Sequence, residues 1–169
     1  EKTLMIASKI DTVNWVLKPH PTRGAYNEST DSIEMMFDRY KTDNMHILAD
    51  DVSAESILNF ADIQITIGGT SGGEFACFGV PAVIVGKPFY YGFGYTIEPA
   101  TYDDYVKTLE NIHDIKPLDE KQTDMAKKLF YLKNNTDIPQ PMYKYDDEFA
   151  NIVNGEYSKM MEVYVTSTY

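Results

Sequence analysis

Short apolar runs that alternate with helix-like segments constrain this chain more than any other feature. The runs are rich in β-branched and aliphatic side chains, and each is soon followed by glycine, proline or aspartate. They are residues 13–17, 45–49, 63–67 and 82–85. The segments between them have apolar residues at helical spacing and begin at Ser or Thr, and they are residues 29–40, 53–60 and 71–78. Strands separated by helices predict a parallel, doubly wound sheet of the Rossmann-like α/β class.

Both ends of the chain differ from this pattern. Residues 101–112, 118–135 and 146–164 are all predicted to be helical, so the C-terminal third is helical. Residues 1–10 also fit a helix, and no strand comes before them, which predicts that the chain is cut from a longer enzyme. We therefore expect one domain over residues 1–169, with an α/β core at 1–112 and C-terminal helices at 113–169.

Composition limits the partners of this domain. The 169 residues carry a formal charge of −11, and nucleic-acid binding needs clustered Lys and Arg that the chain lacks. There is no apolar run of the roughly 20 residues that a membrane span needs, and no signal-peptide pattern. Cys77 is the only cysteine, so no internal disulfide can form. A cytoplasmic, soluble domain without nucleic acid as ligand is expected.

Polar and glycine-rich residues follow three of the predicted strands. Because ligands of open α/β sheets bind beyond the carboxyl ends of the strands, we expect these loops to face one cleft. The first loop contains Lys18, His20 and Arg23, a positive group in a strongly acidic chain that suits a phosphate or carboxylate. An isolated histidine in a loop is, however, more often a surface or structural residue.

The second loop, residues 68–74, has the composition of an anion site. Gly69 and Gly72 would let the backbone approach a phosphate, and Thr70 and Ser71 would add hydroxyl donors. Glu74 could accept hydrogen bonds from ribose hydroxyls. Each feature also has a purely structural explanation, because glycines mark tight turns, serine caps helices and an acidic first turn complements the helix dipole.

The third loop combines glycine with aromatic residues over positions 86–95 and includes Tyr90. Aromatic rings beside a sugar-binding cleft suit stacking on a base or sugar, although local packing explains them equally well. Pairs of adjacent aspartates elsewhere in the chain indicate solvated turns rather than a metal site. No metal and no cofactor are expected.

These motifs together resemble a known family. The segments are residues 15–21 (WVLKPHP), Ala61-Asp62 before a strand, residues 70–74 (TSGGE), residues 79–81 (GVP) and residues 85–90 (VGKPFY). Their order and spacing look like the C-terminal, donor-binding half of capsule polysaccharide biosynthesis glycosyltransferases of the GT-B architecture, over about residues 1–112.

The resemblance implies specific roles. It places the donor phosphate on His20, Ser71 and Gly72, and the ribose on Glu74. The partners would be a nucleotide-activated sugar and an acceptor glycan bound by an N-terminal domain that this chain lacks, and peripheral membrane association of the full enzyme is left open. Catalytic groups in this architecture generally come from the other half or the interdomain cleft, so no catalytic residue is assigned and the fragment is expected to be inactive alone.

Other functions share the same parts. They recur in UDP-N-acetylglucosamine 2-epimerases, in sialyl- and Kdo-transferases and in the polyol-phosphate polymerases of teichoic acid synthesis. An epimerase-like half-domain, a teichoic-acid-type transferase and a non-catalytic sugar-nucleotide-binding module therefore remain alternatives, and the donor stays open.

Overall fold

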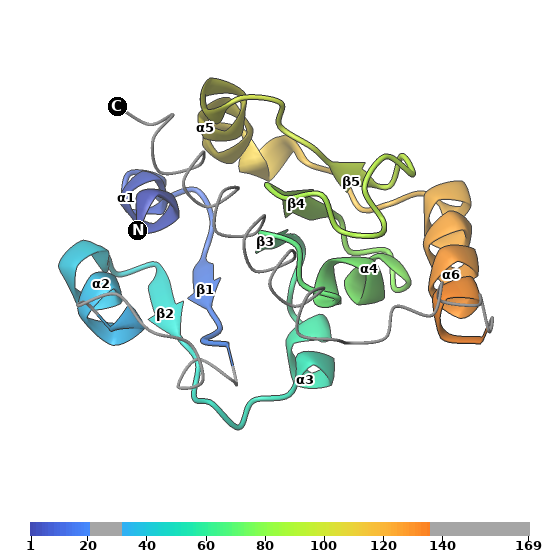
Figure 1. Ribbon diagram of the computed structural model, residues 1–169. Coiled ribbons are helices and arrows are strands. Elements are labelled where there is room, and N and C mark those ends of the chain that lie inside the picture. The colour runs from blue at the N-terminus through green and yellow to red at the C-terminus, as the bar shows by residue number, and fades with distance from the viewer. Residues whose placement is uncertain (21–31, 136–169) are drawn as a thin grey trace, which may run out of the picture. The chain divides into compact units, whose positions relative to one another are not determined.

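Short strands alternate with helices along residues 1–20 and 32–135, the part of the chain that the computed structural model describes (Figure 1). The strands are β1 (Trp15–Leu17), β2 (Met45–Ile47), β3 (Gln64–Thr66), β4 (Ala82–Ile84) and β5 (Thr96–Ile97). The α-helices are α1 (Lys2–Ala7), α2 (Ile33–Tyr40), α3 (Ala54–Leu58), α4 (Ser71–Ala76), α5 (Tyr102–Glu110) and α6 (Glu120–Asn135). The α/β, Rossmann-like fold class predicted from the sequence is confirmed.

The strands pair in parallel, as predicted, but among the described residues they form two sheets rather than one. In the first sheet β1 pairs with β2, with Trp15 opposite Met45. In the second sheet β4 lies between β3 and β5, and Ala82 is opposite both Gln64 and Thr96. The two-residue strand β5 has no counterpart among the predicted strands.

The central strand β4 shows why this sequence forms a buried strand. All three of its residues, Ala82, Val83 and Ile84, are almost completely buried. A parallel strand covered on both faces has no polar side, so a continuous apolar run is what such a position requires. By contrast, every residue of β3 is only half-buried.

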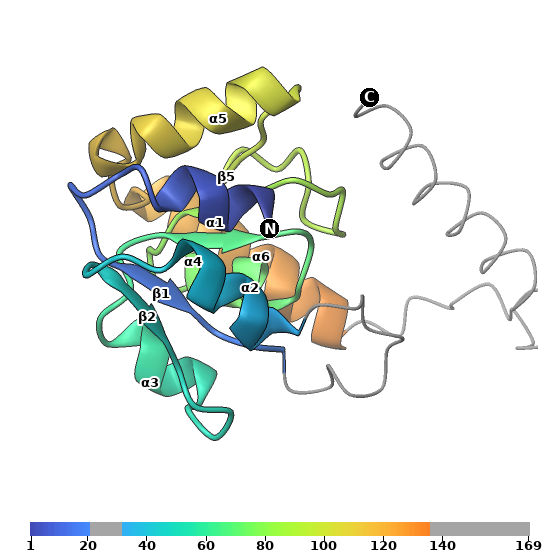
Figure 2. The ribbon, with the colours of Figure 1, turned by 90° about the vertical axis from the view of Figure 1, so that its left-hand side faces the viewer.

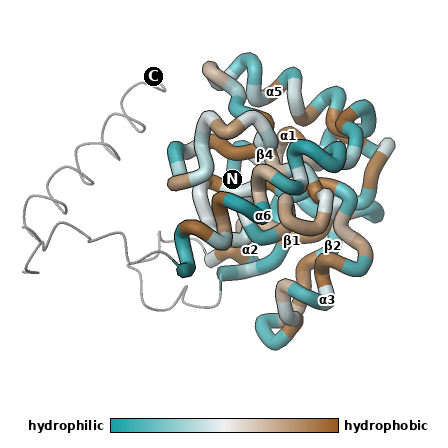
Figure 3. The backbone as a smooth tube through the Cα atoms, turned by 90° about the vertical axis from the view of Figure 1, so that its right-hand side faces the viewer, coloured by the Kyte–Doolittle hydropathy of each residue, from teal (hydrophilic) through white to brown (hydrophobic). Residues whose placement is uncertain are grey.

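Side-chain caps begin four of the described helices, and at the start of α6 the Asp119 carboxylate accepts from the Gln122 N–H at 2.8 Å. Ser32, Ser53 and Thr101 each accept a hydrogen bond from the backbone N–H three residues later, at the start of α2, α3 and α5. Figure 3 shows hydrophilic and hydrophobic residues mixed along α5, as a helix with one buried side requires.

Helices cover both faces of the strands. Figure 2 shows α1 and α5 side by side, and α4 packs against β3 and β4. The hydroxyls of Thr3 on α1 and Tyr105 on α5 are hydrogen-bonded at 2.8 Å. These two helices together cover one side of the core.

The predicted helices agree with the structure in place and differ at their ends. The predicted helix 101–112 is observed as α5 followed by a 3-10 turn at Ile112–Asp114. Helical structure then continues in α6 as far as Asn135. The predicted helix 146–164 lies outside the described residues.

Candidate functional site

The turn between β3 and α4, together with the first turn of α4, carries five of the nine predicted site residues. Gly68, Gly69 and Thr70 are exposed at the carboxyl end of β3, and Ser71 begins α4. The turn is tied to its own strand because the Gly69 N–H donates to the Thr66 hydroxyl at 3.1 Å. The loop is therefore accessible to a ligand and is held to β3 by a hydrogen bond.

Tyr90 supports this turn from beneath. Its side chain is completely buried, and its hydroxyl donates to the Gly69 carbonyl oxygen at 2.6 Å. Burial, and after it the negative charge of Glu74, raise the pKa of the Tyr90 hydroxyl to about 12. Since the ring has no exposed surface, it cannot stack on a base or sugar in this arrangement; it holds the loop instead.

Tyr90 also explains two glycines of the turn. A Cβ atom at Gly72 would overlap the Tyr90 hydroxyl, and one at Gly73 would lie 3.2 Å from the Tyr90 ring. Both glycines are buried. The sequence suggests that Gly72 lets a ligand approach, whereas the structure gives it a packing role against Tyr90.

Ser71 is not a helix cap. The N-cap of α4 is Thr70, and neither hydroxyl accepts a capping bond. The Ser71 hydroxyl oxygen instead accepts a 2.6 Å hydrogen bond from the Gln64 amide nitrogen on β3. Because that bond uses a lone pair of Ser71, the hydroxyl proton of Ser71 can still be donated.

Gln64 is a residue that the sequence analysis missed. Its Nε2 atom holds Ser71, while its Oε1 atom is buried without a partner in the described part of the chain. The one available signal was a polar side chain inside the apolar run IQITI. Buried polar groups are usually hydrogen-bonded, so a polar side chain in a strand that ends at a candidate site indicates a partner nearby.

Backbone donors add to the hydroxyls of this turn. The first N–H groups of the helix bond back to the turn, from Gly72 to Gly69 O and from Gly73 to Thr70 O. The N–H groups of Thr70 and Ser71 have no acceptor within residues 1–20 and 32–135. With the hydroxyls of the same two residues, they form a cluster of donors on one turn, which suits an anionic ligand.

Glu74 lies in the first turn of α4 and is half-buried. The position allows both uses that the sequence suggests, a carboxylate near the helix start and an acceptor for a ligand hydroxyl. No hydrogen bond holds the carboxylate among the described residues.

The loop after β1 belongs to the other sheet. The Lys18 ammonium donates to the carbonyl oxygens of Ala49 and Asp50 at 3.0 and 2.7 Å, so it fastens the loops after β1 and β2 to each other. His20 is exposed, and Arg23 lies outside the described residues. The structure brings Lys18 to the backbone rather than to Ser71, and a site shared by His20 and Ser71 stays a prediction.

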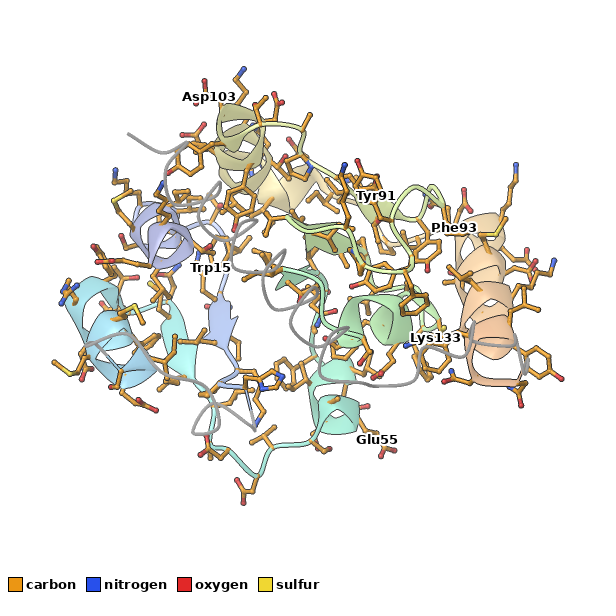
Figure 4. The ribbon with its side chains drawn as sticks, in the orientation of Figure 1. Trp15, Glu55, Tyr91, Phe93, Asp103 and Lys133 are labelled. Carbon is orange, nitrogen blue, oxygen red and sulfur yellow. The ribbon has the colours of Figure 1, made fainter. Side chains whose placement is uncertain are left out.

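The loop from β4 to β5 lies against the glycine turn. The Gly86 N–H donates to the Ile67 carbonyl oxygen at 2.7 Å, and a side chain at Gly86 would meet that same oxygen. Figure 4 labels Tyr91 and Phe93 on this loop and Lys133 on α6. Both aromatic side chains are exposed. Phe89 on the same loop is exposed as well, so these three rings, rather than Tyr90, are accessible to a ligand.

The described residues contain neither a candidate metal site nor a membrane-spanning helix. Within residues 1–20 and 32–135, no group of three or more His, Cys, Asp or Glu side chains could hold a metal ion. No helix in the same ranges is long and apolar enough to cross a bilayer.

The sequence of this chain matches a known protein family. The model of the family described as "Capsule polysaccharide biosynthesis protein" matches residues 4–119, which include β1 to β5 and the glycine turn. No curated protein and no solved structure matches the chain.

Proposed function

Because this chain belongs to the family of capsule polysaccharide biosynthesis proteins, we propose that it is the donor-binding domain of a glycosyltransferase that acts in capsule synthesis. The ligand would be a nucleotide-activated sugar. Membership of the family supports the role in capsule synthesis, and the geometry of the glycine turn supports the finer assignment.

The observation that carries the proposal is the set of donors on Thr70 and Ser71. Two backbone N–H groups that have no acceptor among the described residues and two hydroxyls meet on one turn, which is exposed at Gly68, Gly69 and Thr70. A diphosphate offers several anionic oxygens, and bonds from neutral donors to charged acceptors are stronger than neutral pairs. The turn would therefore hold the phosphates of the donor.

The residues that hold the turn would also keep its hydrogen-bond donors in place. Tyr90 fixes Gly69, and Gln64 fixes the Ser71 oxygen, so the donors need little reordering when a ligand binds. Glu74 would accept hydrogen bonds from the ribose hydroxyls. In the transfer reaction this domain would orient the donor and stabilise charge on the leaving diphosphate, while the acceptor and the catalytic group come from elsewhere.

Calorimetric titration of the chain with UDP, CDP, GDP and CMP tests the proposal. One nucleotide should bind with a clear preference, and Thr70→Ala should weaken its binding by about 1.5–3 kcal/mol, the range for a hydrogen bond to a charged group. The Thr70 hydroxyl makes no capping bond, so this substitution leaves the fold intact. If none of the four nucleotides binds, the donor-domain assignment is wrong.

Glu74→Gln tests the ribose contact. Nucleotide binding should weaken by roughly 1.5–3 kcal/mol, the range for a hydrogen bond to a charged group. Wild type should also lose affinity for a 2′,3′-dideoxy nucleotide, whereas Glu74→Gln should lose little more, because both changes remove the same interaction. Glu110→Gln, an exposed glutamate on α5, is the matched control. Independent, additive losses would rule out the ribose role.

A further inference from the structure

The second half of α6 is basic, although the chain as a whole is acidic. Residues 125–135 contain three lysines and no aspartate or glutamate, in a chain with a formal charge of −11. Lys127 and Lys128 lie in the middle of the helix, and Lys128 is paired with Asp124 at 2.6 Å. Lys133 lies in the last turn. A local group of positive charge attracts anions even on a protein whose net charge is negative.

Lys133 lies on the face of α6 that packs against the core. Ala126, seven positions earlier, is buried in the cluster that contains Ala76 of α4, and Leu129, four positions earlier, packs against the same cluster. Side chains four and seven positions apart share one face of a helix. Lys133 therefore continues this inward face one turn beyond Leu129, and Figure 4 shows it on the side of α6 toward α4.

The Lys133 ammonium is held over the ring of Phe89. Its Nζ atom lies 4.1 Å from the ring centroid, the geometry of a cation–π contact. Phe89 packs edge-to-face against Tyr90, with 5.1 Å between the ring centroids, and a Cβ atom at Gly73 would lie 3.7 Å from the Phe89 ring. One aromatic ring therefore separates this ammonium from the first turn of α4, next to the donors of the proposed phosphate site.

The contact with Phe89 leaves the N–H groups of Lys133 without an acceptor. Within residues 1–20 and 32–135 the ammonium makes no ion pair and no hydrogen bond. Lys18, which the sequence predicts for the site, donates instead to two backbone carbonyl oxygens. A lysine ammonium has three donors and a full positive charge, and this combination suits the oxygens of a phosphate.

A purely structural role also exists for Lys133, because a cation in the last turn of a helix complements the helix dipole. That role is the same at any position of the last turn and involves no aromatic ring. The place of the ammonium over Phe89, on the inward face and beside the glycine turn, favours a ligand instead.

We propose that Lys133 binds the phosphate groups of the ligand that the turn of Thr70 and Ser71 holds. The turn supplies neutral donors, and Lys133 supplies the positive charge that these donors lack. Phe89 keeps the ammonium beside the turn and, being apolar, offers it no carboxylate that competes with the ligand. The inference rests on the proposed phosphate site and adds to it a residue from a helix outside the motifs of the sequence.

Titration with inorganic pyrophosphate, followed by NMR through the Thr70 and Ser71 amides, tests the proposal. Lys133→Met removes the charge and keeps an unbranched side chain over Phe89, so the affinity should fall about fivefold or more. Lys133→Arg keeps the charge and also stacks on aromatic rings, so its affinity should stay within about twofold of the wild type. Lys128→Met is the matched control, because it makes the same change of side chain and net charge at an exposed position of the same helix.

Sodium chloride separates a charge contact from a packing effect. Raising its concentration from about 0.05 M to about 0.5 M shortens the Debye length, so pyrophosphate binding should weaken more in the wild type and in Lys133→Arg than in Lys133→Met. A role in the helix dipole alone gives a different result: Lys133→Met then lowers the Tm and leaves the pyrophosphate affinity and its salt dependence unchanged.

Three results overturn the proposal. Pyrophosphate could shift neither amide of the turn in the wild type. Lys133→Met could bind it as tightly as the wild type does, which leaves the lysine with the helix dipole alone. Lastly, Lys133→Met and Lys128→Met could lose equal affinity, which identifies a general effect of net charge.

The nucleotide titrations have a separate outcome. Pyrophosphate binding that depends on Lys133, together with no binding of any nucleotide, supports this inference and removes the donor-domain assignment. A preferred nucleotide that binds Lys133→Met as tightly as the wild type supports the donor-domain assignment and removes this inference.

Discussion

Gly72 packs directly against Tyr90, so the residue at either position limits the size of the side chain that fits at the other. Gly72→Ala should destabilise the fold by about 1–3 kcal/mol, because its Cβ would overlap the Tyr90 hydroxyl. Tyr90→Phe removes that hydroxyl, so in its background the same alanine should cost less. The relief should be partial, since the ring Cζ atom at position 90 and a methyl group of Thr66 would still lie 3.0 and 3.2 Å from the new Cβ. Urea denaturation of both single variants and the double variant gives the coupling.

Gly68→Ala is the control for this cycle. Its Cβ would meet only Pro88, at 3.7 Å, and the position is exposed, so stability should change by no more than about 0.5 kcal/mol. If the costs of Gly72→Ala and Tyr90→Phe simply add, overlap with Tyr90 is not the reason for the glycine.

The buried Tyr90 hydroxyl also ties stability to alkaline pH. Its pKa is raised to about 12, above the value of about 10 in the unfolded chain, so its contribution is complete below pH ~10 and is lost as the pH approaches ~12. In this window the unfolded chain binds fewer protons, and stability should fall by up to about 1.4 kcal/mol per pH unit from this group. Denaturation midpoints measured over the window should decline less steeply in Tyr90→Phe. Identical slopes in both proteins would contradict the assignment.

At the scale of the element, two threonines at helix starts differ in what they do. The Thr101 hydroxyl accepts from the Asp104 N–H at 3.1 Å and donates to the Asp104 carboxylate at 2.7 Å, whereas Thr70 makes no capping bond. Thr101→Ala should therefore cost about 1 kcal/mol. Thr70→Ala should cost much less. Thermal denaturation of both variants checks the difference, and a Thr101→Ala variant as stable as the wild type would mean that the cap on α5 contributes nothing.

Helices and strands were predictable where the local sequence contains a recognisable pattern. Thr101 followed by acidic residues predicts the start of α5, and the run that becomes β4 is apolar throughout because the strand is buried on both faces. Strand β5 has only Thr96 and Ile97, and its conformation comes from pairing with β4. Two residues are too few for a period to be recognised.

The candidate site, too, was predictable only in part from the sequence. The sequence predicts where the turn lies, because glycine, serine and threonine follow a strand. It does not reveal that Tyr90 reaches Gly69 across 21 positions, or that Gln64 holds Ser71, because both contacts arise from tertiary packing. The same packing determines why Gly72 is a glycine.

At the scale of the whole described unit, α1 and β1 both connect two of the three core clusters, and Trp15 of β1 packs against each of the two. Ile6 packs in the cluster of Val83 on β4, and Leu4 packs in the cluster of Met45 on β2. No described residue of β1 pairs with β3 through the backbone. Packing of side chains around α1 and β1 therefore carries much of the connection between the two sheets.

Leu4→Ala should weaken one half of this core before the other. Removing a buried leucine side chain costs about 2–5 kcal/mol, and the side chain lost here lies in the cluster of Phe37 and Met45. Local opening follows the local loss of packing, so the amides of β2 should lose more protection from hydrogen exchange than those of β4. Leu109→Ala, a matched deletion in the cluster of Val83, should reverse that order. If either variant lowers protection of β2 and β4 by the same factor, the two sheets open as one unit, and α1 is then part of a single cooperative core rather than a link between two.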